Sequence, residues 1–478
     1  MLDGRPAEAQ PQSSARAVVF TNVSVVNVDS VQDDVALVVQ GDRIAAIGPN
    51  DAILKQYANA DVYSGRGKAI VAGLINCHAH LGATLQRGFN EDFGFPNSAK
   101  LAVSPGSLLQ GEEATLMYTI GALEAIRTGT TTMVEFSSNI ARHVPALAKT
   151  GLRWVFAEGV RDTENVAGPL SPEGFAMSVP PRYSAKLRDE GMQRINDLFS
   201  KWHGSNQGRI SVFPAASLSE TSSPELLQAV RAFAEKHDLG YTIHLSQSRA
   251  EVEFSKKHLG LSPPFYLAQH DYLGPRLFAA HCRYVDDADI ALLGKTGTIV
   301  SHQAAMAANR GVIPPIHKLR AAGCPIALGT DNNTNDVFEV MRIALLTERI
   351  DRDDPFPGVR PQPEDMLEDC TIGGARAVRQ SQQIGVLEAG RKADLLVVNT
   401  QRAHLVPAGR FLSAWVHNGQ ASDIESVMID GQFVIRDNKV LTMDEAAVIA
   451  EADKVSKRIW GAVRKAGPVV IPGRPRQQ

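Results

Sequence analysis

Lys68-Ala-Ile-Val-Ala-Gly-Leu-Ile-Asn-Cys-His78-Ala-His80 is the stretch of sequence on which the fold assignment depends. Its apolar run has the length of a strand buried on both faces, and the histidines come where such a strand gives way to a loop. Residues two apart in a strand point to the same side, so His78 and His80 can present their imidazoles to one ion. Alone the pair is a weak signal, because buried histidines often only hydrogen-bond to a backbone carbonyl.

Three further runs strengthen this signal. Tyr241-Thr-Ile-His244, Phe278-Ala-Ala-His281 and Ile326-Ala-Leu-Gly-Thr-Asp331 each put a ligand-type residue at the end of a short apolar segment. Histidine and carboxylate side chains that gather from several strand ends are typical of a metal site. We therefore expect a fold that brings these three residues together with His78 and His80.

Composition limits the class of protein. The chain has 478 residues, of which 44% are hydrophobic, enough for a large core and more than one domain. A formal net charge of -3 gives no basic footprint for nucleic acid or an anionic membrane. We expect small-molecule partners and copies of the same chain, that is, a homo-oligomer.

The cysteines and the apolar runs bear on the compartment. The four cysteines form no Cys-X-X-Cys pair, so neither a disulfide framework nor a thiolate zinc site is indicated. The start of the chain lacks the apolar stretch of a signal peptide, and we find no run of about 18 apolar residues. A cytoplasmic protein is the expectation.

The middle of the chain alternates strand-like and helix-like segments. Eight strands are predicted over 69–76, 130–136, 152–158, 209–216, 241–245, 276–281, 297–302 and 325–330. Amphipathic stretches over 112–127, 223–237, 288–295 and 336–350 fill gaps between them. Eight such units predict an α/β protein with a (β/α)8 barrel, whose chemistry lies at the C-terminal strand ends.

The two ends of the chain share a different pattern, namely short predicted strands that are rich in β-branched residues. This predicts a small composite β-sandwich domain, built from both ends, into which the barrel is inserted. We divide the chain into a disordered lead-in over 1–16, the β domain over 17–67 plus 387–440, the catalytic barrel over 68–386, and a C-terminal helix and tail over 441–478. We expect the helix over 444–464 to pack on the surface or on another subunit.

Two long connections, 88–111 and 161–185, follow strand ends and are rich in Gly, Pro and Ser. Loops of that length in a compact domain usually act as lids or substrate walls. Their aromatic residues, Phe93 among them, either line an apolar pocket or pin the loops to the barrel.

The ligand set favours a catalytic site over a structural one. We expect His78, His80, His244 and Asp331 to hold one divalent metal with an open position, and zinc, iron(II), cobalt or manganese would all accept them. Such a metal lowers the pKa of bound water from about 15.7 towards ~7 and so supplies hydroxide. Asp331 can also take the proton, and His281 is either a long ligand or the group that holds the hydroxide for attack.

A missing lysine indicates a single metal. Barrel hydrolases with two metals commonly bridge them with a carboxylated lysine on the fourth strand. The predicted fourth strand, Arg209-Ile-Ser-Val-Phe-Pro-Ala-Ala-Ser, has none. A mononuclear site follows.

Several segments together resemble the amidohydrolase superfamily. The resemblance rests on Val71-Ala-Gly-Leu-Ile-Asn-Cys-His-Ala-His, Gly129-Thr-Thr-Thr, Gly208-Arg-Ile-Ser-Val-Phe-Pro, Ile243-His-Leu, Ala280-His-Cys, Gly329-Thr-Asp-Asn with Asn335-Asp336, and Gly385-Val-Leu-Glu-Ala-Gly-Arg-Lys-Ala-Asp-Leu. The chain is most similar to the branch with atrazine chlorohydrolase, melamine deaminase and the S-adenosylhomocysteine, guanine and cytosine deaminases. The resemblance covers about residues 17–440 and implies the same ligands, His78, His80, His244 and Asp331, with His281 beside the water. It also implies the composite β domain.

One residue departs from this pattern. The branch usually reads His-X-X-Glu after the fifth strand, with the glutamate as proton donor, whereas this chain reads His244-Leu-Ser-Gln247. A neutral amide donates a hydrogen bond but delivers no proton. Glu135, at the end of the second strand, either replaces the acid, pairs with Arg153 or caps a loop. Because general acid catalysis is worth ~10²–10⁴-fold, Gln247 favours a halide over an amine as leaving group.

Four residues are candidate substrate contacts: His302, Asn332, Arg161 and Phe93. His302 ends the seventh strand and either meets the substrate or is a hydrogen-bonded core histidine. Asn332 follows Asp331, and Arg161 follows the third strand, where it would meet an anionic substituent.

The sequence thus predicts a mononuclear metal-dependent hydrolase that uses metal-bound hydroxide to displace a halide or an amine from a nitrogen heterocycle or similar electron-poor ring. The alternative is a hydrolase of amide, urea or carbamate C–N bonds. A third hypothesis is a metal-binding barrel without catalysis, against which the complete ligand set argues.

Overall fold

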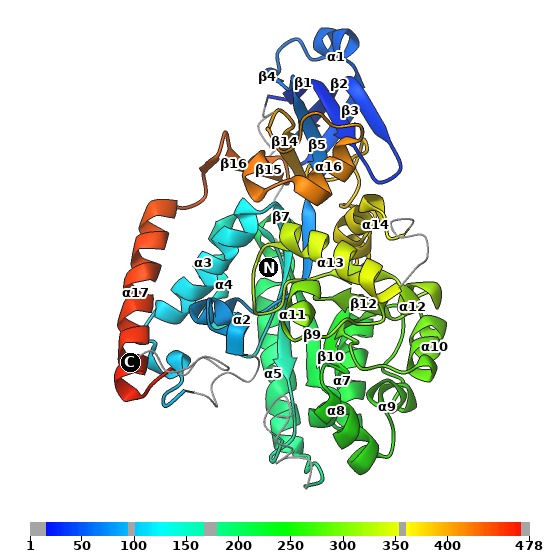
Figure 1. Ribbon diagram of the computed structural model, residues 1–478, viewed down its shortest axis with the longest axis vertical. Coiled ribbons are helices and arrows are strands. Elements are labelled where there is room, and N and C mark those ends of the chain that lie inside the picture. Colours follow the sequence, from blue (N-terminus) through cyan, green and yellow to red (C-terminus); the bar gives the residue numbers. More distant parts are fainter. Residues whose placement is uncertain (1–15, 94–100, 167–178, 353–359, 470–478) are drawn as a thin grey trace, which may run out of the picture.

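The computed structural model describes residues 16–93, 101–166, 179–352 and 360–469, which form a barrel and a smaller sheet that caps one end of the molecule (Figure 1). Eight parallel strands curl into the barrel in the order β13-β12-β11-β10-β9-β8-β7-β6. They are β6 (Leu74–Ala79), β7 (Thr130–Ser137), β8 (Arg153–Val160), β9 (Ile210–Leu218), β10 (Tyr241–Leu245), β11 (Leu277–His281), β12 (Ile299–His302) and β13 (Ile326–Leu328). The predicted (β/α)8 barrel is confirmed.

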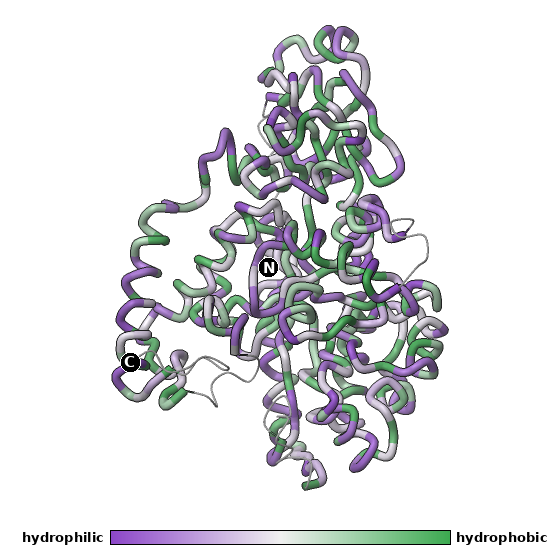
Figure 2. Tube along the Cα trace, viewed as in Figure 1, coloured by the Kyte–Doolittle hydropathy of each residue, from purple (hydrophilic) through white to green (hydrophobic). Residues whose placement is uncertain are grey.

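The helices of the barrel begin at recognisable caps. In α7 (Pro224–Lys236), the Ser223 side chain accepts the backbone N–H of Leu226, and the proline occupies the first turn. In α10 (Asp287–Thr296), Asp286 and Asp289 form a capping box. Other helices are α3 (Glu113–Arg127), α5 (Ala185–Trp202) and α13 (Val337–Arg352). Each mixes polar and apolar residues along its length, as in Figure 2, and its apolar face packs on the strands.

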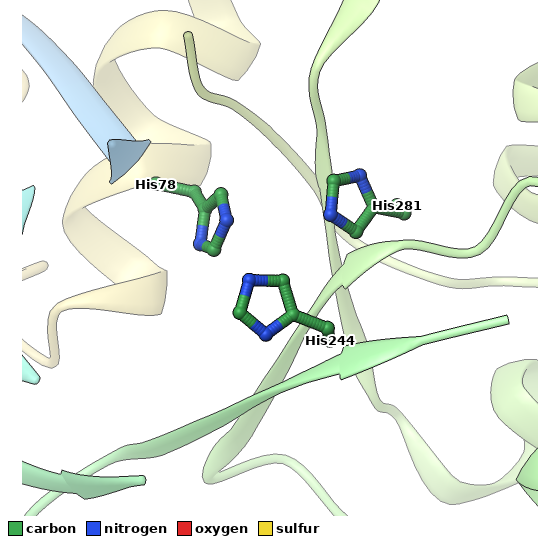
Figure 3. Close-up of side chains that lie close together, drawn as sticks. All are labelled: His78, His244 and His281. Atoms are coloured by element: carbon green, nitrogen blue, oxygen red, sulfur yellow. The ribbon is translucent and has the colours of Figure 1, made fainter. Parts of the chain in front are cut away.

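The barrel closes where the end of β13 meets β6. The backbone N–H groups of Thr330 and Asp331 both donate to the carbonyl oxygen of His78 at 2.9 Å, and Asp331 forms an isolated parallel bridge with Ala79. The approach is so close that a Cβ on Gly329 would lie 2.8 Å from the backbone N of His78. At this end of the barrel, the rings of His78, His244 and His281 turn toward one another (Figure 3).

The smaller sheet combines strands from both ends of the chain. Its order is β17-β16-β15-β14-β5-β1-β2-β3, with β4 paired to β1. The N-terminal strands are β1 (Val18–Val26), β2 (Val31–Gln40), β3 (Arg43–Pro49), β4 (Asp61–Ser64) and β5 (Lys68–Ala72), and the C-terminal ones are β14 (Leu395–Asn399), β15 (Ile424–Ile429), β16 (Gln432–Arg436) and β17 (Lys439–Val440). The expected composite β unit is therefore present.

The first predicted barrel strand, 69–76, was wrong in extent. The run forms two strands, because β5 pairs with β1 and β14 in the small sheet and only β6, after Gly73, belongs to the barrel. One continuous apolar segment thus passes from one sheet into the other. The strand that carries His78 and His80 is therefore covalently continuous with a strand of the small sheet.

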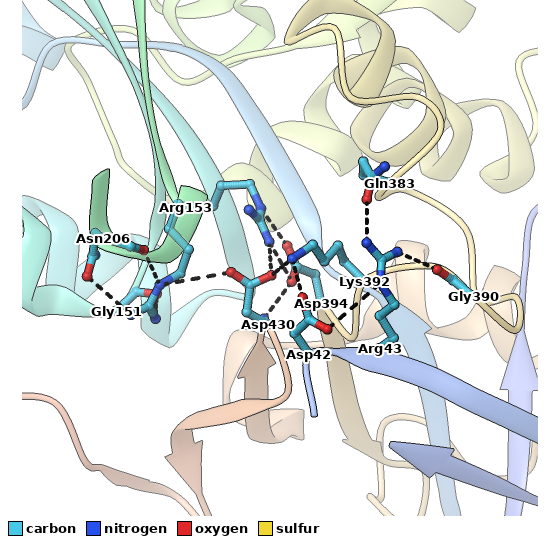
Figure 4. Close-up of polar contacts among 11 residues, drawn as sticks. Asp42, Arg43, Gly151, Arg153, Asn206, Gln383, Gly390, Lys392, Asp394 and Asp430 are labelled. Carbon is cyan, nitrogen blue, oxygen red and sulfur yellow. Dashed lines mark hydrogen bonds and ion pairs between the residues drawn. The ribbon is translucent and has the colours of Figure 1, made fainter. Parts of the chain in front are cut away.

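A buried ion-pair network joins the small sheet to the barrel (Figure 4). Arg153, at the start of β8 and 2% exposed, donates to both carboxylate oxygens of Asp394 and to Asp430. Lys392 lies 3.1 Å from the same Asp430 carboxylate and also pairs with Asp42. Two buried carboxylates of the β domain, Asp394 and Asp430, therefore both pair with one arginine of the barrel.

The C-terminal helix α17 (Glu445–Ala466) packs within its own chain. Its apolar face, Val455, Ile459 and Val463, lies against Met117 of α3 and Leu85. The Trp460 indole N–H donates to the Leu85 carbonyl at 3.0 Å, and its ring lies against Phe89. Of the two expectations for this helix, surface packing within one chain is the one observed.

Residues 1–15 of the predicted lead-in and residues 470–478 of the predicted tail lie outside the described residues. Within the described part of the chain, no helix is both long and apolar enough to cross a membrane.

Candidate metal centre and active site

Five ligand-type side chains meet at the C-terminal mouth of the barrel, as the sequence predicted. His78 and His80 come from β6, His244 from β10, His281 from β11, and Asp331 from the loop after β13. Two overlapping groups, His78–His244–His281 and His78–His80–Asp331, have ligand atoms that all lie within 4.8 Å of one another. Strand ends some 250 residues apart thus supply one cluster.

The backbone fixes which nitrogen of His80 and His244 faces the centre. The Nδ1 of His80 lies 2.7 Å from the carbonyl oxygen of Phe136, and the Nδ1 of His244 lies 2.7 Å from that of Ser217. A carbonyl only accepts, so both Nδ1 atoms carry the proton and both Nε2 atoms are bare. These two Nε2 lone pairs lie 3.1 Å apart. Facing lone pairs repel unless a cation lies between them, and the arrangement is the usual one for metal-bound histidines.

His78 gives a second, independent indication of a metal. Its side chain is fully buried, and neither ring nitrogen has a hydrogen-bond partner among the described residues. Burial lowers the pKa of His78 well below its ordinary value, so the ring stays neutral. A buried neutral imidazole without a partner is costly unless a ligand satisfies it.

Asp331 completes the cluster. Its Oδ1 lies 3.8 Å from the Nε2 of His80 and its Oδ2 lies 3.6 Å from the Nε2 of His281. The backbone of Asp331 is left-handed, with φ of 63°, a conformation held by its bonds to β6. Burial raises the pKa of Asp331, while the charges on His80, Arg283 and Arg310 oppose the rise. The Oδ2 atom has no hydrogen-bond partner in the described structure, as expected of a ligand atom.

His281 is held from its backbone. Its N–H donates to the Oε1 of Gln303 at 2.9 Å, and its φ of 81° turns the ring toward the centre. Burial lowers the pKa of His281 well below its ordinary value, and the Arg283 charge adds to this. The neutral imidazoles, the bare nitrogens and the aspartate together fit a divalent cation of the borderline class.

The cluster is buried on one side and open on the other. His78, His281 and Asp331 are at most 3% exposed, whereas the side chain of His80 is 27% exposed. The small cavity beside His80 is also lined by Ala83, Thr84, Arg87 and residues 331–335. Solvent can therefore reach the centre from this side.

Gln247 follows His244 by three positions, in a tightly held loop after β10. It is 7% exposed, and its Nε2 has no partner among the described residues. Glu251 anchors the loop by accepting the N–H groups of Ser246 at 2.7 Å and Gln247 at 2.6 Å. The unpaired carboxamide N–H group can therefore donate to a bound molecule.

Glu135 faces the base of the cluster rather than Arg153. Its Oε2 accepts the backbone N–H of Leu81 at 2.9 Å, and its Oε1 accepts the Ser137 hydroxyl at 2.5 Å. Complete burial raises the pKa of Glu135 to about 8. These bonds support the turn after His80, while the raised pKa keeps a proton available at neutral pH.

The four candidate substrate contacts lie in different surroundings. His302 is buried, burial lowers its pKa to about 3, and its Nδ1 has no partner among the described residues. Asn332 is half-buried beside Asp331, and its carbonyl accepts the Asn90 side chain at 3.1 Å. Arg161 is exposed at the end of β8, and no contact in the described structure joins it to the cluster. The side chain of Phe93 lies outside the described part of the molecule.

Sequence reasoning missed three residues at this mouth. Phe136 packs its ring against His244, with centroids 4.4 Å apart, and supplies the carbonyl for His80. Arg283 and Arg310 bring two positive charges close to Asp331. The one available signal was position, since Arg283 comes directly after His281-Cys282.

Comparisons with known proteins agree with this geometry. The amidohydrolase family model matches residues 69–434. A 5-methylthioadenosine/S-adenosylhomocysteine deaminase of Desulforudis audaxviator (strain MP104C) is 30% identical over 432 residues, which is 89% of this chain and 95% of the relative. A 5'-deoxyadenosine deaminase of Methanothermobacter thermautotrophicus is 30% identical over 443 residues, again 89% and 95%.

Solved structures share the fold. An adenosine deaminase from Xanthomonas campestris with bound zinc superposes with a TM-score of 0.81 at 24% identity, covering 93% of this chain and 98% of that one. Atrazine chlorohydrolase TrzN from Arthrobacter aurescens TC1, complexed with zinc, gives a TM-score of 0.77 at 19% identity, covering 92% and 100%.

Proposed function

Because the chain belongs to the amidohydrolase family, whose members are metal-dependent hydrolases, we propose that it hydrolyses a nitrogen heterocycle and expels a ring-bound amine. The observation that carries the proposal is the bare Nε2 pair of His80 and His244 beside the unpartnered, buried His78. The relatives, named as deaminases of adenosine derivatives, favour the amine as leaving group.

We assign His78, His80, His244 and Asp331 as the residues that hold one divalent ion. A divalent ion at such a site supplies an activated water at neutral pH. The donor set suits zinc, iron(II), cobalt or manganese. Zinc is the first choice, since it is the metal in the two structural neighbours.

Side chains of the protein then orient the metal ligands, accept the proton and hold the substrate. His80 and His244 are fixed by the carbonyls of Phe136 and Ser217, so their bare nitrogens are oriented in advance. Asp331, whose Oδ2 lies 3.6 Å from the His281 Nε2, would accept the proton of the attacking water, and His281 would hydrogen-bond to that water. Gln247 would donate its free N–H to the ring and hold it in place.

Gln247 also supports a second candidate reaction, the displacement of a halide. An amide cannot protonate a departing amine, whereas a halide leaves as a stable anion and needs no proton. If an amine leaves, Glu135 is the protonated group in the structure that can replace the acid, because burial raises its pKa to about 8.

A matched-pair assay separates the two leaving groups. Zinc-loaded protein is given adenosine or 6-chloropurine riboside, and in parallel one 1,3,5-triazine ring bearing either an amino or a chloro group. Ammonia and chloride are both monitored. We expect hydrolysis to be lost on chelation and in Asp331→Asn, and to persist in Asp287→Asn, which changes an exposed surface aspartate.

The outcome decides between the classes. Faster ammonia release supports the amine, and faster chloride release supports the halide. Release of a carboxylic acid or arylamine from amide, urea or carbamate substrates, with both rings left intact, would contradict the proposal.

A further inference from the structure

Arg283 is buried at the mouth without a carboxylate partner. It follows His281 by two residues, is 8% exposed, and its Nη1 lies 3.2 Å from the sulfur of Met306. Its Nε has no hydrogen-bond partner, and no carboxylate lies within ion-pair distance of the guanidinium in the described part of the chain. Burial of an unpaired charge is expensive, so such a group usually awaits a ligand.

Arg310 lies beside it at the end of α11 (Ala304–Asn309), the helix that also carries Met306. Its Nη1 donates to the carbonyl oxygen of Asn90 at 2.9 Å, and Asn90 in turn donates to the carbonyl oxygen of Asn332. The Nε and Nη2 of Arg310 are buried without partners among the described residues. Arg310 is therefore tied to the loop that carries Asp331 while part of its guanidinium stays free.

The charges of Arg283 and Asp331 both act on the pKa of Arg310, in opposite directions. Burial lowers the pKa of Arg310, the charge of Arg283 lowers it further, and Asp331 opposes both. Burial likewise lowers the pKa of Arg283, and the charge of Asp331 again opposes this shift. Each guanidinium is therefore within electrostatic reach of the centre.

Two arginines with structural roles look different. The buried Arg153 donates to Asp394 and Asp430, and the half-buried Arg320 donates to Asp369 and Glu348. Each of these two arginines thus has two carboxylate partners. Arg283 and Arg310 lack that provision in the described structure, and they follow β11 and α11 at the C-terminal end of the barrel rather than at a domain boundary.

We propose that Arg283 and Arg310 form an anion-binding subsite that holds a carboxylate group on the substrate, next to the ring that is hydrolysed. The inference rests on the proposed function and narrows its substrate class to carboxylate-bearing heterocycles. A planar carboxylate matches the fork of N–H groups on a guanidinium, and charge-assisted bonds of this kind are about twice as strong as neutral ones. Asp331 cannot fill the role, because its oxygens face His80 and His281.

A binding experiment tests this without turnover. The zinc-loaded full chain is titrated by calorimetry with nicotinate and with nicotinamide, two pyridines that differ in the charge of one substituent. We expect nicotinate to bind at least about tenfold more tightly. In Arg283→Met and in Arg310→Met, this preference should fall to within about twofold. Arg249→Met, which removes an exposed arginine near Tyr284 at the same end of the barrel, should keep it.

Thermal melts separate binding from structure. Because Arg283 has no carboxylate partner, Arg283→Met should melt no lower than the unaltered protein. Should that variant fail to fold, Arg310→Met and Arg310→Lys carry the test, and the lysine variant should lose most of the preference because it lacks the fork. The proposal is overturned if the unaltered protein shows no preference for nicotinate, or if both methionine variants keep it. Either result leaves the matched-pair hydrolysis assay unaffected.

Discussion

At the level of single residues, His78 supplies the most direct argument for a metal. Its ring is buried, neutral and without a hydrogen-bond partner in the described structure, and its neighbours His80 and His244 point bare nitrogens at the same space. A core histidine with a structural role would instead bond to a carbonyl group or a carboxylate.

His78→Ala should therefore lose the bound metal. We expect the affinity for zinc, and with it the hydrolytic rate, to fall at least about 100-fold, since even groups that only orient a ligand are worth 10–100-fold. Metal content by mass spectrometry after dialysis measures the first effect. His317→Gln, a change at a half-buried histidine paired with Asp351, is the control and should retain its metal. Full metal occupancy in His78→Ala would refute the assignment.

His302 should make stability depend on pH. Burial lowers its pKa in the folded protein to about 3 from the ordinary histidine value of 6.5, so below pH 6.5 only the unfolded chain takes up the proton. Its contribution is thus fully present above pH 6.5 and is lost as the pH falls toward 3. Between pH 7 and pH 5, the free energy of unfolding should fall by up to about 2 kcal/mol more in the unaltered protein than in His302→Gln. The prediction would be contradicted if the free energy of unfolding in urea fell equally, between pH 7 and pH 5, in the unaltered protein and in His302→Gln.

Much of the site could be predicted from the sequence because its ligand-type residues sit at strand ends, where hydropathy shows them. His78, His80, His244, His281 and Asp331 were all recognised in this way. Arg283 and Arg310 could not be, because a charge in a loop looks solvated until the packing around it is known. They stand out only because the described structure provides no carboxylate partner for either guanidinium.

At the level of elements, the contact between β13 and β6 brings Asp331 to the histidines. Two N–H groups after β13 donate to the His78 carbonyl, and the Asn76 side chain bonds to Thr330 from the other side, with Nδ2 to Oγ1 at 2.9 Å. Only glycine leaves room for this approach at position 329.

Gly329→Ala should disturb both the barrel and the site. A Cβ there would lie 2.8 Å from the backbone N of His78, so the strands must separate. We expect a loss of about 1–3 kcal/mol in the free energy of unfolding and weaker zinc binding. The control is Gly461→Ala on the exposed side of α17, where a Cβ meets nothing within 4 Å and should stabilise the helix by up to about 1 kcal/mol. Undiminished zinc affinity in Gly329→Ala would count against this role for the β13–β6 contact.

The periodicity of the sequence predicted the elements well and their partners less well. Strands β7 to β13 and helices such as α7 and α13 appear close to their predicted ranges, because burial leaves a clear apolar pattern. The division of 69–76 between two sheets was missed, because β5 and β6 are both buried almost throughout and hydropathy does not record which sheet a strand joins.

For the whole molecule, the network around Arg153 couples the small sheet to the barrel. The arginine comes from β8, its carboxylate partners Asp394 and Asp430 come from the β domain, and all three are at most 5% exposed. Lys392 compensates only one of the two carboxylates.

Arg153→Met should therefore be among the most damaging changes remote from the active site. Removing one partner of a buried ion pair leaves the other charge uncompensated, which costs about 3–5 kcal/mol in the free energy of unfolding. Arg16→Met, which breaks an exposed pair with Asp61, should change it by less than about 1 kcal/mol. Equal stabilities for the two variants in urea would show that the network does not hold the domains together.

The central claim, that His78, His80, His244 and Asp331 hold one metal ion that drives hydrolysis, is tested most directly by a metal titration. Metal-stripped protein is titrated with zinc, and bound zinc and ammonia release from an amino-substituted heterocycle are followed together. We predict one zinc per chain, with a rate that rises in proportion to bound zinc and levels off at one equivalent, and neither tight binding nor turnover in Asp331→Asn. A rate independent of bound zinc, or a rise that continues to a second equivalent, would contradict the account.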